Sequence, residues 1–371
     1  MTDLTRDDIE SVLLRTYPEV ISAITPEHIP LINAAKDGSF GFSYLGLMLY
    51  ANGCNQKGLS TQFPQGLLYH DQKAIFGVGF FKWHPDEHIW HMHIVAPRGS
   101  DWENVIEAFI RTYREKTGLH EGAVYVRHLH PSQFESLRSH GYFSIDALPW
   151  DRSAPSEDET FNHRCIRISD VVTQEASGEI TVHILKTDDT RDFKRKAKLA
   201  FNRFQNFLER NEATFVLEPY AVDTHKDIAT RMVIEHFASL KNAVGSTPED
   251  YFNLLRFFPE RAGDDFIGYV GYLVGHGQRI PLSLFIGEKI DSHTVALYAT
   301  FALRNHREIR REFDETGYSA ISQYAYIRVF AALLSLGVTH ADLGGSEMED
   351  LDRFKRQLGA KEKKTYWAVK K

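Results

Sequence analysis

One order of secondary-structure elements, strand, helix, strand, helix, occurs twice along this chain. In the first copy, residues 89–95 read as a strand, and a helix begins at Ser100. Apolar side chains then recur at the spacing of one helix face, at Trp102, Val105, Ile106, Phe109, Ile110 and Tyr113. A second strand over residues 123–129 and a short helix opened by Pro131 complete this copy.

The second copy lies in the C-terminal half. Residues 295–303 read as a strand and residues 318–336 as a long helix, whose only interior charge is Arg328. We therefore expect this helix to be buried on most sides. Residues 339–343 form the next strand, and a closing helix and a final strand over residues 365–369 follow.

Two parallel strands joined through a helix require that helix to cross over the sheet. The repeated order therefore predicts two mixed α/β domains. Residues 151–162 are polar and turn-rich, which predicts a linker, so we expect one domain over residues 1–160 and another over residues 161–371. The length of 371 residues suits two domains, and a composition of 43% hydrophobic and 25% charged residues is typical of globular chains.

Charge and composition exclude several classes of protein. A net charge of -7 argues against a generally basic nucleic-acid coat protein, although it does not exclude a local basic patch. Cys54 and Cys165 are too few and too far apart for a disulfide scaffold or a thiolate metal site. The sequence has no apolar run of about 18 residues, and its acidic start is unlike a signal peptide. We expect a soluble cytoplasmic protein without stable membrane insertion.

The segment after the last strand of the second copy is the strongest candidate site. Asp342 ends a strand, Gly344-Gly345 forms a turn, and Ser346 with Glu349 has the spacing of a capping box. Open α/β sheets place their sites at the carboxyl ends of strands, and a Gly-Gly turn lets a ligand approach the backbone. Lys355 follows on the closing helix, where it could also be an ordinary solvated lysine.

This run of a strand, Asp-x-Gly-Gly, a spacer, Phe-Lys-x-x-x-Gly and an aromatic strand resembles the last part of FemAB-type aminoacyltransferases. It also resembles the C-terminal domain of lysylphosphatidylglycerol synthases. Both are tandem GNAT-like proteins, so the resemblance implies two tandem GNAT-like (acyl-CoA N-acyltransferase-type) domains with mixed central sheets. It also implies transfer of an aminoacyl group from aminoacyl-tRNA to an amine or hydroxyl acceptor on a lipid, a peptide or a small molecule.

The resemblance carries residue roles with it. Lys355 would polarise the carbonyl of the donor, Phe354 would pack beside the donor, and Asp342 matches the family's strand aspartate. We place Tyr298 on the acceptor side as a further catalytic residue. The expected substrate contacts beside Phe354 are Gly344, Gly345 and Arg353. No base is evident, so the acceptor amine would lose its proton to the substrate or to water.

A basic helix over residues 190–210 is the second candidate. One face is apolar, and Lys194, Arg195, Lys198 and Arg203 lie among the basic residues elsewhere on it. These side chains could hold the phosphates of tRNA, or they could form an ordinary solvated face.

Histidines gather in the N-terminal half, and they could bind zinc or act as a base. They precede Pro97 or Pro131, at His84, His88, His91, His93, His128 and His130. No carboxylate stands at a familiar ligand spacing, so surface histidines are the simpler interpretation and we expect no metal.

The Gly-rich pyrophosphate loop of coenzyme-A enzymes is absent from both halves. We therefore expect no cofactor and favour aminoacyl-tRNA as donor. An acyl-CoA-dependent N-acyltransferase, with a coenzyme A thioester as donor, and a non-catalytic RNA- or ligand-binding protein of the same fold remain the alternatives.

Overall fold

The computed structural model describes two compact units, one of residues 1–156 and 364–371 and one of residues 157–363. In the first, it describes residues 21–36 without 24, residues 67–70, 75–84, 89–95, 124–144, 364 and 366–370, and scattered positions between 38 and 114. In the second, it describes residues 163–183, 191–240, 265–304, 306–346 and 349–363, with five positions between 248 and 255. Each unit is considered by itself.

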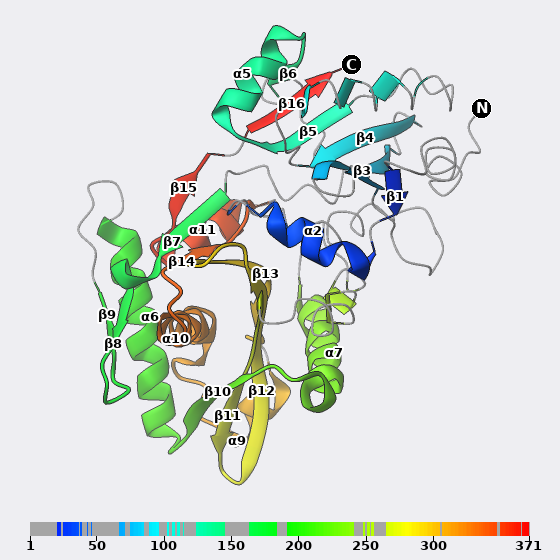
Figure 1. Cartoon of the computed structure of the whole chain (residues 1–371). Coiled ribbons are helices and arrows are strands. Elements are labelled where there is room, and N and C mark those ends of the chain that lie inside the picture. Colours follow the sequence, from blue (N-terminus) through cyan, green and yellow to red (C-terminus); the bar gives the residue numbers. More distant parts are fainter. Residues whose placement is uncertain are drawn as a thin grey trace. The chain divides into compact units, whose positions relative to one another are not determined.

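The first unit is built on one sheet with the strand order β1-β2-β3-β4-β5-β16-β6. Its elements, shown in Figure 1, are β1 (Ile21–Ala23), η1 (Pro26–His28), α2 (Ile29–Ala34), β2 (Leu67–His70), β3 (Ile75–His84), β4 (Ile89–Val95), β5 (Val124–Leu129), α5 (Pro131–Ser139), β6 (Phe143–Ser144) and β16 (Tyr366–Lys370). As expected from the repeated order, β4 and β5 are parallel. The described positions between residues 102 and 114 are helical, and Ile106 and Ile110 are buried.

The C-terminal strand belongs to the first unit, and not to the second domain as the sequence predicted. The second domain was expected to run to residue 371, but β16 pairs antiparallel with β5 and β6 in the sheet of the first unit. Trp367, Ala368 and Val369 are buried there, and the Arg127 guanidinium lies 4.2 Å from the centre of the Trp367 ring. The chain therefore returns to its first unit after Lys363.

The second unit has a larger sheet, in the order β10-β11-β12-β13-β14-β7-β15, and a separate β8-β9 pair. Its strands are β7 (His163–Arg167), β8 (Val172–Gln174), β9 (Ile180–Val182), β10 (Thr214–Pro219), β11 (Phe266–Gly275), β12 (Gln278–Lys289), β13 (Thr294–Ala302), β14 (His340–Asp342) and β15 (Lys361–Lys363). Its helices are η3 (Ile168–Asp170), α6 (Arg191–Arg210), α7 (Val222–Ser239), α9 (Arg307–Glu312), η5 (Tyr318–Ala320), α10 (Ile321–Ser335) and α11 (Glu349–Gln357).

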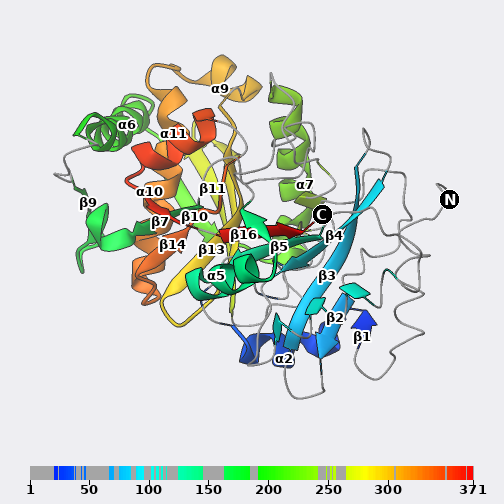
Figure 2. The same ribbon diagram turned by 90° about the horizontal axis from the view of Figure 1, so that it is seen from above.

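Helices cover both faces of the larger sheet. Phe285 of β12 packs edge-on against Tyr326 of α10, with ring centres 4.8 Å apart. Phe301 of β13 stacks on His236 of α7 at 4.4 Å. Figures 1 and 2 accordingly show α6 and α10 on one side of the strands and α7 on the other. Below, these are called the α10 face and the α7 face.

The second copy of the repeated order is also present, because β13 and β14 are parallel and α10 connects them. Most of α10 is buried, as its single interior charge predicted. The capping box expected before α11 is wrong. Ser346 Oγ is buried with no hydrogen-bond partner among the described residues, and Glu349 instead pairs with Arg353. The mixed α/β class is confirmed in both units.

Candidate functional site

The candidate site lies where β13 and β14 stop pairing. The two parallel strands are in register only at Thr294–Ala296 and His340–Asp342. Beyond Ala296, β13 continues to Ala302, whereas the chain after Asp342 stays with β7: Leu343 N donates to Arg164 O at 2.8 Å, and Arg164 N donates to Gly344 O at 3.1 Å. The carboxyl ends of two parallel strands therefore separate at this point, which is the usual location of ligand sites in α/β sheets.

The turn after β14 is held from several directions. Gly344 has a φ of 66°, a conformation in which a Cβ is unfavourable. Its amide donates to Asp342 Oδ1 at 3.0 Å. The backbone therefore favours a glycine here, and the hydrogen bond to Asp342 fixes the turn.

Asp342 has no exposed surface, and basic groups surround its carboxylate. Lys363 Nζ lies 3.0 Å from Oδ2 and His163 Nδ1 lies 3.7 Å from Oδ1. Burial alone would raise the pKa of this carboxyl, but His163, Lys363 and the Gly344 amide together lower it below its ordinary value of 3.8. Because it is buried and bonded to the turn, we revise the role expected for Asp342 from a catalytic to a positioning residue.

Lys355 is not a solvated helix lysine. It is only 5% exposed, and its ammonium donates to Gly344 O at 3.2 Å and to Gly345 O. Burial of an ammonium is costly unless carbonyls or carboxylates replace its water. The structure thus joins three of the expected site residues, Gly344, Gly345 and Lys355, into one arrangement that holds a positive charge at the carboxyl end of β14.

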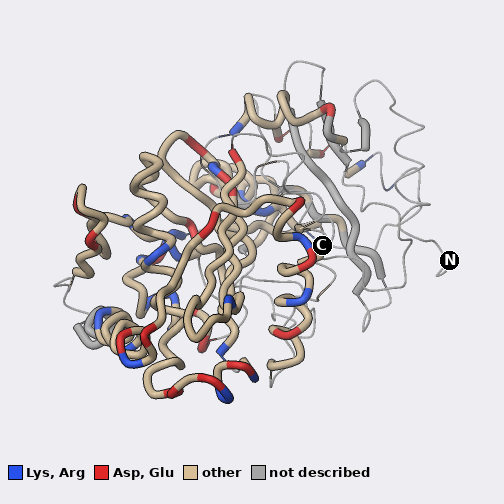
Figure 3. The backbone as a smooth tube through the Cα atoms, turned by 90° about the horizontal axis from the view of Figure 1, so that it is seen from below, with Lys and Arg blue, Asp and Glu red and all other residues tan. Residues whose placement is uncertain are grey.

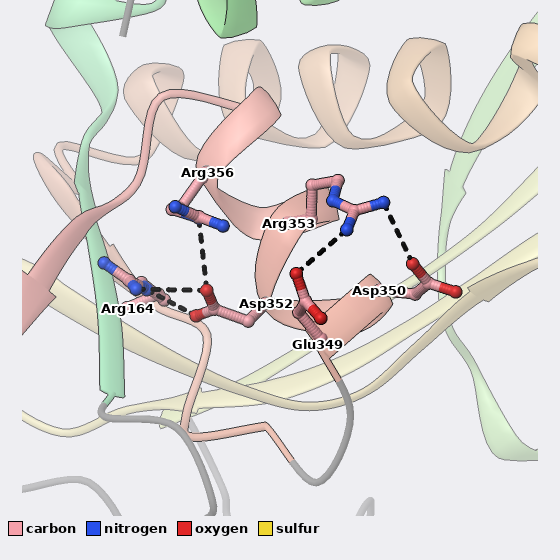
Figure 4. Close-up of polar contacts among 6 residues, drawn as sticks. All are labelled: Arg164, Glu349, Asp350, Asp352, Arg353 and Arg356. Atoms are coloured by element: carbon pink, nitrogen blue, oxygen red, sulfur yellow. Dashed lines mark hydrogen bonds and ion pairs between the residues drawn. The ribbon is translucent and has the colours of Figure 1, made fainter. Parts of the chain in front are cut away.

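A buried ion cluster fixes α11 and with it Lys355. Asp352 accepts from Arg164 of β7 at 2.6 Å on Oδ1 and at 3.1 Å on Oδ2, and Arg356 Nε lies 3.1 Å from the same Oδ2. Figure 4 shows Asp352 between the two guanidinium groups. Arg353 lies apart from this cluster: it is exposed and pairs with Glu349 and Asp350 on its own helix. The structure does not bring Arg353 to the turn.

Phe354 lies beside Lys355 in sequence and packs on the α10 face. Its ring is 5.5 Å from that of Tyr326, and the Tyr326 hydroxyl bonds to Thr300 of β13. The Arg304 guanidinium lies 6.0 Å from the Phe354 ring, and its Nε donates to Ser322 Oγ in the first turn of α10 at 2.9 Å.

Sequence reasoning missed Thr300, Arg304, Ser322 and Tyr326 as companions of Phe354. The sequence did not single out Arg304. The signal that could have found it is its place two residues after the carboxyl end of β13, one of the two parallel strands that border the site.

Tyr298 lies on the other face of the sheet. Its hydroxyl donates to Glu288 Oε1 at 2.9 Å. Phe285 of the same strand points to α10, so strand alternation puts Glu288, three positions later, on the α7 face. Tyr298 and Phe354 are therefore on opposite faces of the sheet.

The expected basic helix is present as α6, and the structure describes the side chains of two of its four named basic residues. The side chains of Lys194 and Arg195 lie outside the described residues, Lys198 is half-buried and Arg203 is exposed. The exposed stripe mixes charges with neutral side chains and contains Lys196, Leu199, Asn202, Arg203, Asn206, Glu209 and Arg210. Figure 3 shows α6 end-on at the lower left, with basic and acidic positions along it.

The histidine group expected in the N-terminal half lies mostly outside the described residues. The side chains of His84, His88, His91, His93 and His128 lie outside them, and no group of three or more His, Cys, Asp or Glu that could hold a metal occurs within them.

Burial, and to a smaller extent the nearby Asp342, raises the pKa of the Cys165 thiol to about 11, so this cysteine is not a thiolate at neutral pH. Among the described residues, no helix is long and apolar enough to span a bilayer.

Comparison with solved structures identifies the fold. A conserved protein of unknown function from Bacteroides thetaiotaomicron matches with a TM-score of 0.60 at 14% identity, over 95% of this chain and 99% of that one. L-PGS from Bacillus licheniformis matches with a TM-score of 0.52 at 12% identity, over 94% and 92% of the two chains. FemX matches with a TM-score of 0.52 at 12% identity, over 94% and 96%.

These likenesses extend along almost the whole chain, including the N-terminal half, where the sequence supported the resemblance only through the order of elements. The expected fold of two tandem GNAT-like domains, and the resemblance to FemAB-type and lysylphosphatidylglycerol synthase proteins, are confirmed at the level of the fold. No family model and no curated protein sequence matches the chain.

Proposed function

We propose that this protein is an acyl-transfer enzyme that takes an aminoacyl group from aminoacyl-tRNA and transfers it to an amine or hydroxyl acceptor. The observation that carries the proposal is the buried Lys355 ammonium on the Gly344–Gly345 turn, at the carboxyl end of β14. The shared fold with FemX and L-PGS supports it, because the sequence resembles the same families around this Phe-Lys pair.

The chemistry follows from the position of the charge. When the acceptor attacks the ester carbonyl of the donor, negative charge develops on the carbonyl oxygen. A fixed cation beside that oxygen stabilises the transition state more than the ground state, typically by about 3–4 kcal/mol per donor. Lys355 is held by backbone carbonyls and by a helix anchored through Asp352, so little reorganisation is needed as the charge develops.

The donor would lie on the α10 face. Phe354 and Tyr326 offer it an aromatic surface, and the exposed Arg304 next to them is a partner for a phosphate. Lys196 and Arg203 lie on the exposed stripe of α6 on the same face and would add attraction for a polyanion. An aminoacyl-tRNA has both features that this surface suits, an ester carbonyl and a chain of phosphates.

The test is a transfer assay with a matched pair of lysine variants. Total tRNA charged with labelled amino acids is the donor, and a mixture of simple amines, short peptides and anionic lipid vesicles supplies the acceptors. Lys355→Met keeps the length of the side chain and removes the charge, and we expect it to lower kcat by about 10²–10³-fold. Lys361→Met, which removes an exposed pair with Asp170, should leave the rate unchanged.

Transfer by Lys355→Met at the wild-type rate would overturn the role of Lys355. Failure of the wild-type chain to transfer from any charged tRNA, with turnover of acyl-CoA in the same assay, would favour the acyl-CoA-dependent alternative instead.

A further inference from the structure

Glu288 is a carboxylate that the fold keeps almost entirely out of water. It is 2% exposed, it lies near the end of β12, and its Oε1 accepts the Tyr298 hydroxyl proton at 2.9 Å. Burial of a carboxylate is strongly unfavourable unless hydrogen bonds compensate for the lost water. The Glu288–Tyr298 pair thus sets a buried carboxylate against a tyrosine hydroxyl on the strand that borders the candidate site.

The backbone at this pair is irregular in a way that aims Tyr298. Gly287 of β12 pairs with Leu297, but the preceding residue, Ile286, pairs with Ala299. Tyr298 is thus the extra residue of a β-bulge, a feature that redirects a side chain and is frequent beside active sites. Gly287 is required opposite the bulge, because a Cβ there would lie 2.3 Å from Ala296 O.

The bulge also marks the place where β13 loses its neighbour. Pairing with β14 ends at Ala296, two residues before Tyr298. On the other side of this separation, Lys355 and the Gly344–Gly345 turn follow β14. Tyr298 on β13 and Gly344 after β14, whose carbonyl Lys355 holds, therefore each lie two residues beyond the last paired residues of the two strands, Ala296 and Asp342.

We propose that Tyr298 and Glu288 form the proton relay that deprotonates the acceptor, with Tyr298 contacting the acceptor and Glu288 acting through it. The inference rests on the proposed acyl transfer and supplies the base that the sequence lacked. A tyrosine whose proton is donated to a carboxylate still has acceptor lone pairs on its oxygen. An amine or hydroxyl group can donate its proton to that oxygen.

The step balances in atoms and charge. A protonated amine passes one proton to the Tyr298 oxygen as the Tyr298 proton passes to Glu288, and its freed nitrogen bonds to the donor carbonyl carbon. The bond from the carbonyl carbon to the tRNA 3′ oxygen then breaks, and the leaving oxygen takes the second proton of the nitrogen. A hydroxyl acceptor passes its one proton through Tyr298 to Glu288 as it attacks, and the leaving oxygen then takes a proton from water. The proton on Glu288 returns through Tyr298 to water, so both side chains end as they began.

The experiment compares two model acceptors that differ in their need for a base. Ethylamine is protonated at neutral pH and must lose a proton before it attacks, whereas hydroxylamine is mostly unprotonated. The donor is total tRNA charged with labelled amino acids, and the uncatalysed reaction is subtracted. Glu288→Gln keeps the size of the side chain and an acceptor for the Tyr298 hydroxyl, but an amide cannot take the proton.

With ethylamine, we expect Glu288→Gln and Tyr298→Phe each to lower kcat by about 10²-fold or more, with the KM for charged tRNA unchanged. The double variant should be no worse than either single variant, because the two side chains act as one unit. With hydroxylamine, both variants should stay within about tenfold of the wild type. The matched controls are Glu218→Gln in β10 and Tyr220→Phe just after it, which make the same chemical changes away from the site. Tyr220 Oη has no hydrogen-bond partner among the described residues. Neither control should change the rate with either acceptor.

Equal losses with both acceptors would show a structural role and overturn the relay, as would full activity of Glu288→Gln with ethylamine. If Glu288→Gln does not fold, the rates of Tyr298→Phe with ethylamine and hydroxylamine distinguish the relay from a structural role. A wild-type chain that is inactive with both acceptors would overturn the proposed function itself, which distinguishes that failure from failure of the relay.

Discussion

Asp342 and Lys355 are both ionisable side chains that the fold buries, and they hold the same turn from opposite ends. Asp342 accepts the Gly344 amide, and Lys355 donates to the Gly344 and Gly345 carbonyls. Their charges are compensated by Lys363 and by peptide carbonyls, so neither is isolated. The energetic consequence is that removing either charge should cost more than removing a surface charge.

Asp342→Asn should lower the free energy of unfolding by about 3 kcal/mol, because it leaves Lys363 and the Gly344 amide without their charged partner. Asp170→Asn breaks the exposed pair with Lys361 and should cost less than about 1 kcal/mol. Urea unfolding of both variants checks this. Equal effects of the two substitutions would contradict the description of Asp342 as a buried anchor.

His236 gives a prediction for pH. Burial, followed by the charge of Arg304, lowers its pKa from 6.5 to about 4, so folding favours the neutral ring. Its contribution to stability is complete above pH 6.5 and is lost as the pH falls from there through about 4. In urea unfolding over that range, His236→Phe should keep the stack on Phe301 and show a weaker loss of stability than the wild type. Identical pH slopes would contradict the assignment.

The sequence predicted the residues of the site that lie close together along the chain and missed those that only folding assembles. Gly344, Gly345, Phe354 and Lys355 form one short motif, so a local pattern reveals them. Tyr298 was named from its place on a strand, but its partner Glu288 comes from another strand and meets it through a bulge. A one-residue irregularity in pairing has no periodic signal, because it depends on how two strands fit.

At the scale of elements, the repeated order of strands and helices was predictable because each element has its own periodicity. β4 and β5, and then β13 and β14, are the parallel pairs that this order required. The separation of β13 from β14 was not predictable. It results from the hydrogen bonds of Leu343 and Gly344 to Arg164 of β7, a strand that lies far away in the sequence.

Gly287→Ala tests the bulge. The added methyl group would lie 2.3 Å from Ala296 O and 2.8 Å from Leu297 Cδ2, so β13 must shift. Overpacking of this kind costs about 1–3 kcal/mol, and we expect that loss in urea unfolding, together with reduced transfer in the ethylamine assay. Unchanged stability and unchanged transfer would show that the register at Tyr298 does not matter.

At the scale of the whole molecule, the domain boundary was the hardest feature to read from the sequence. The final strand follows the second unit along the chain, so the order of elements in the sequence placed it in the second domain. Its pairing with β5 and β6 is instead decided by a long-range fit, in which Trp367 lies against Arg127. Each unit consequently has a sheet that is complete only with a strand from a distant part of the sequence.

A chain that ends at Lys363 should therefore lose the native structure of its first unit. It would lack β16, whose Trp367, Ala368 and Val369 are buried in that sheet. We expect limited proteolysis to degrade residues 1–156 of the shortened chain and to leave a resistant fragment near residues 157–363. A chain that ends at Lys370 is the matched control and should resist like the wild type. Equal resistance of both shortened chains would contradict the assignment of β16.

The central claim is that the Lys355 turn serves acyl transfer from aminoacyl-tRNA, and the choice of donor tests it most directly. The measurement gives the wild-type chain labelled aminoacyl-tRNA or a labelled acyl-CoA mixture, with the same amines, peptides and lipid vesicles as acceptors, and follows the label into product. The account predicts product from charged tRNA, lost when the donor is first treated with ribonuclease, and none above background from acyl-CoA. Product from acyl-CoA alone would contradict it.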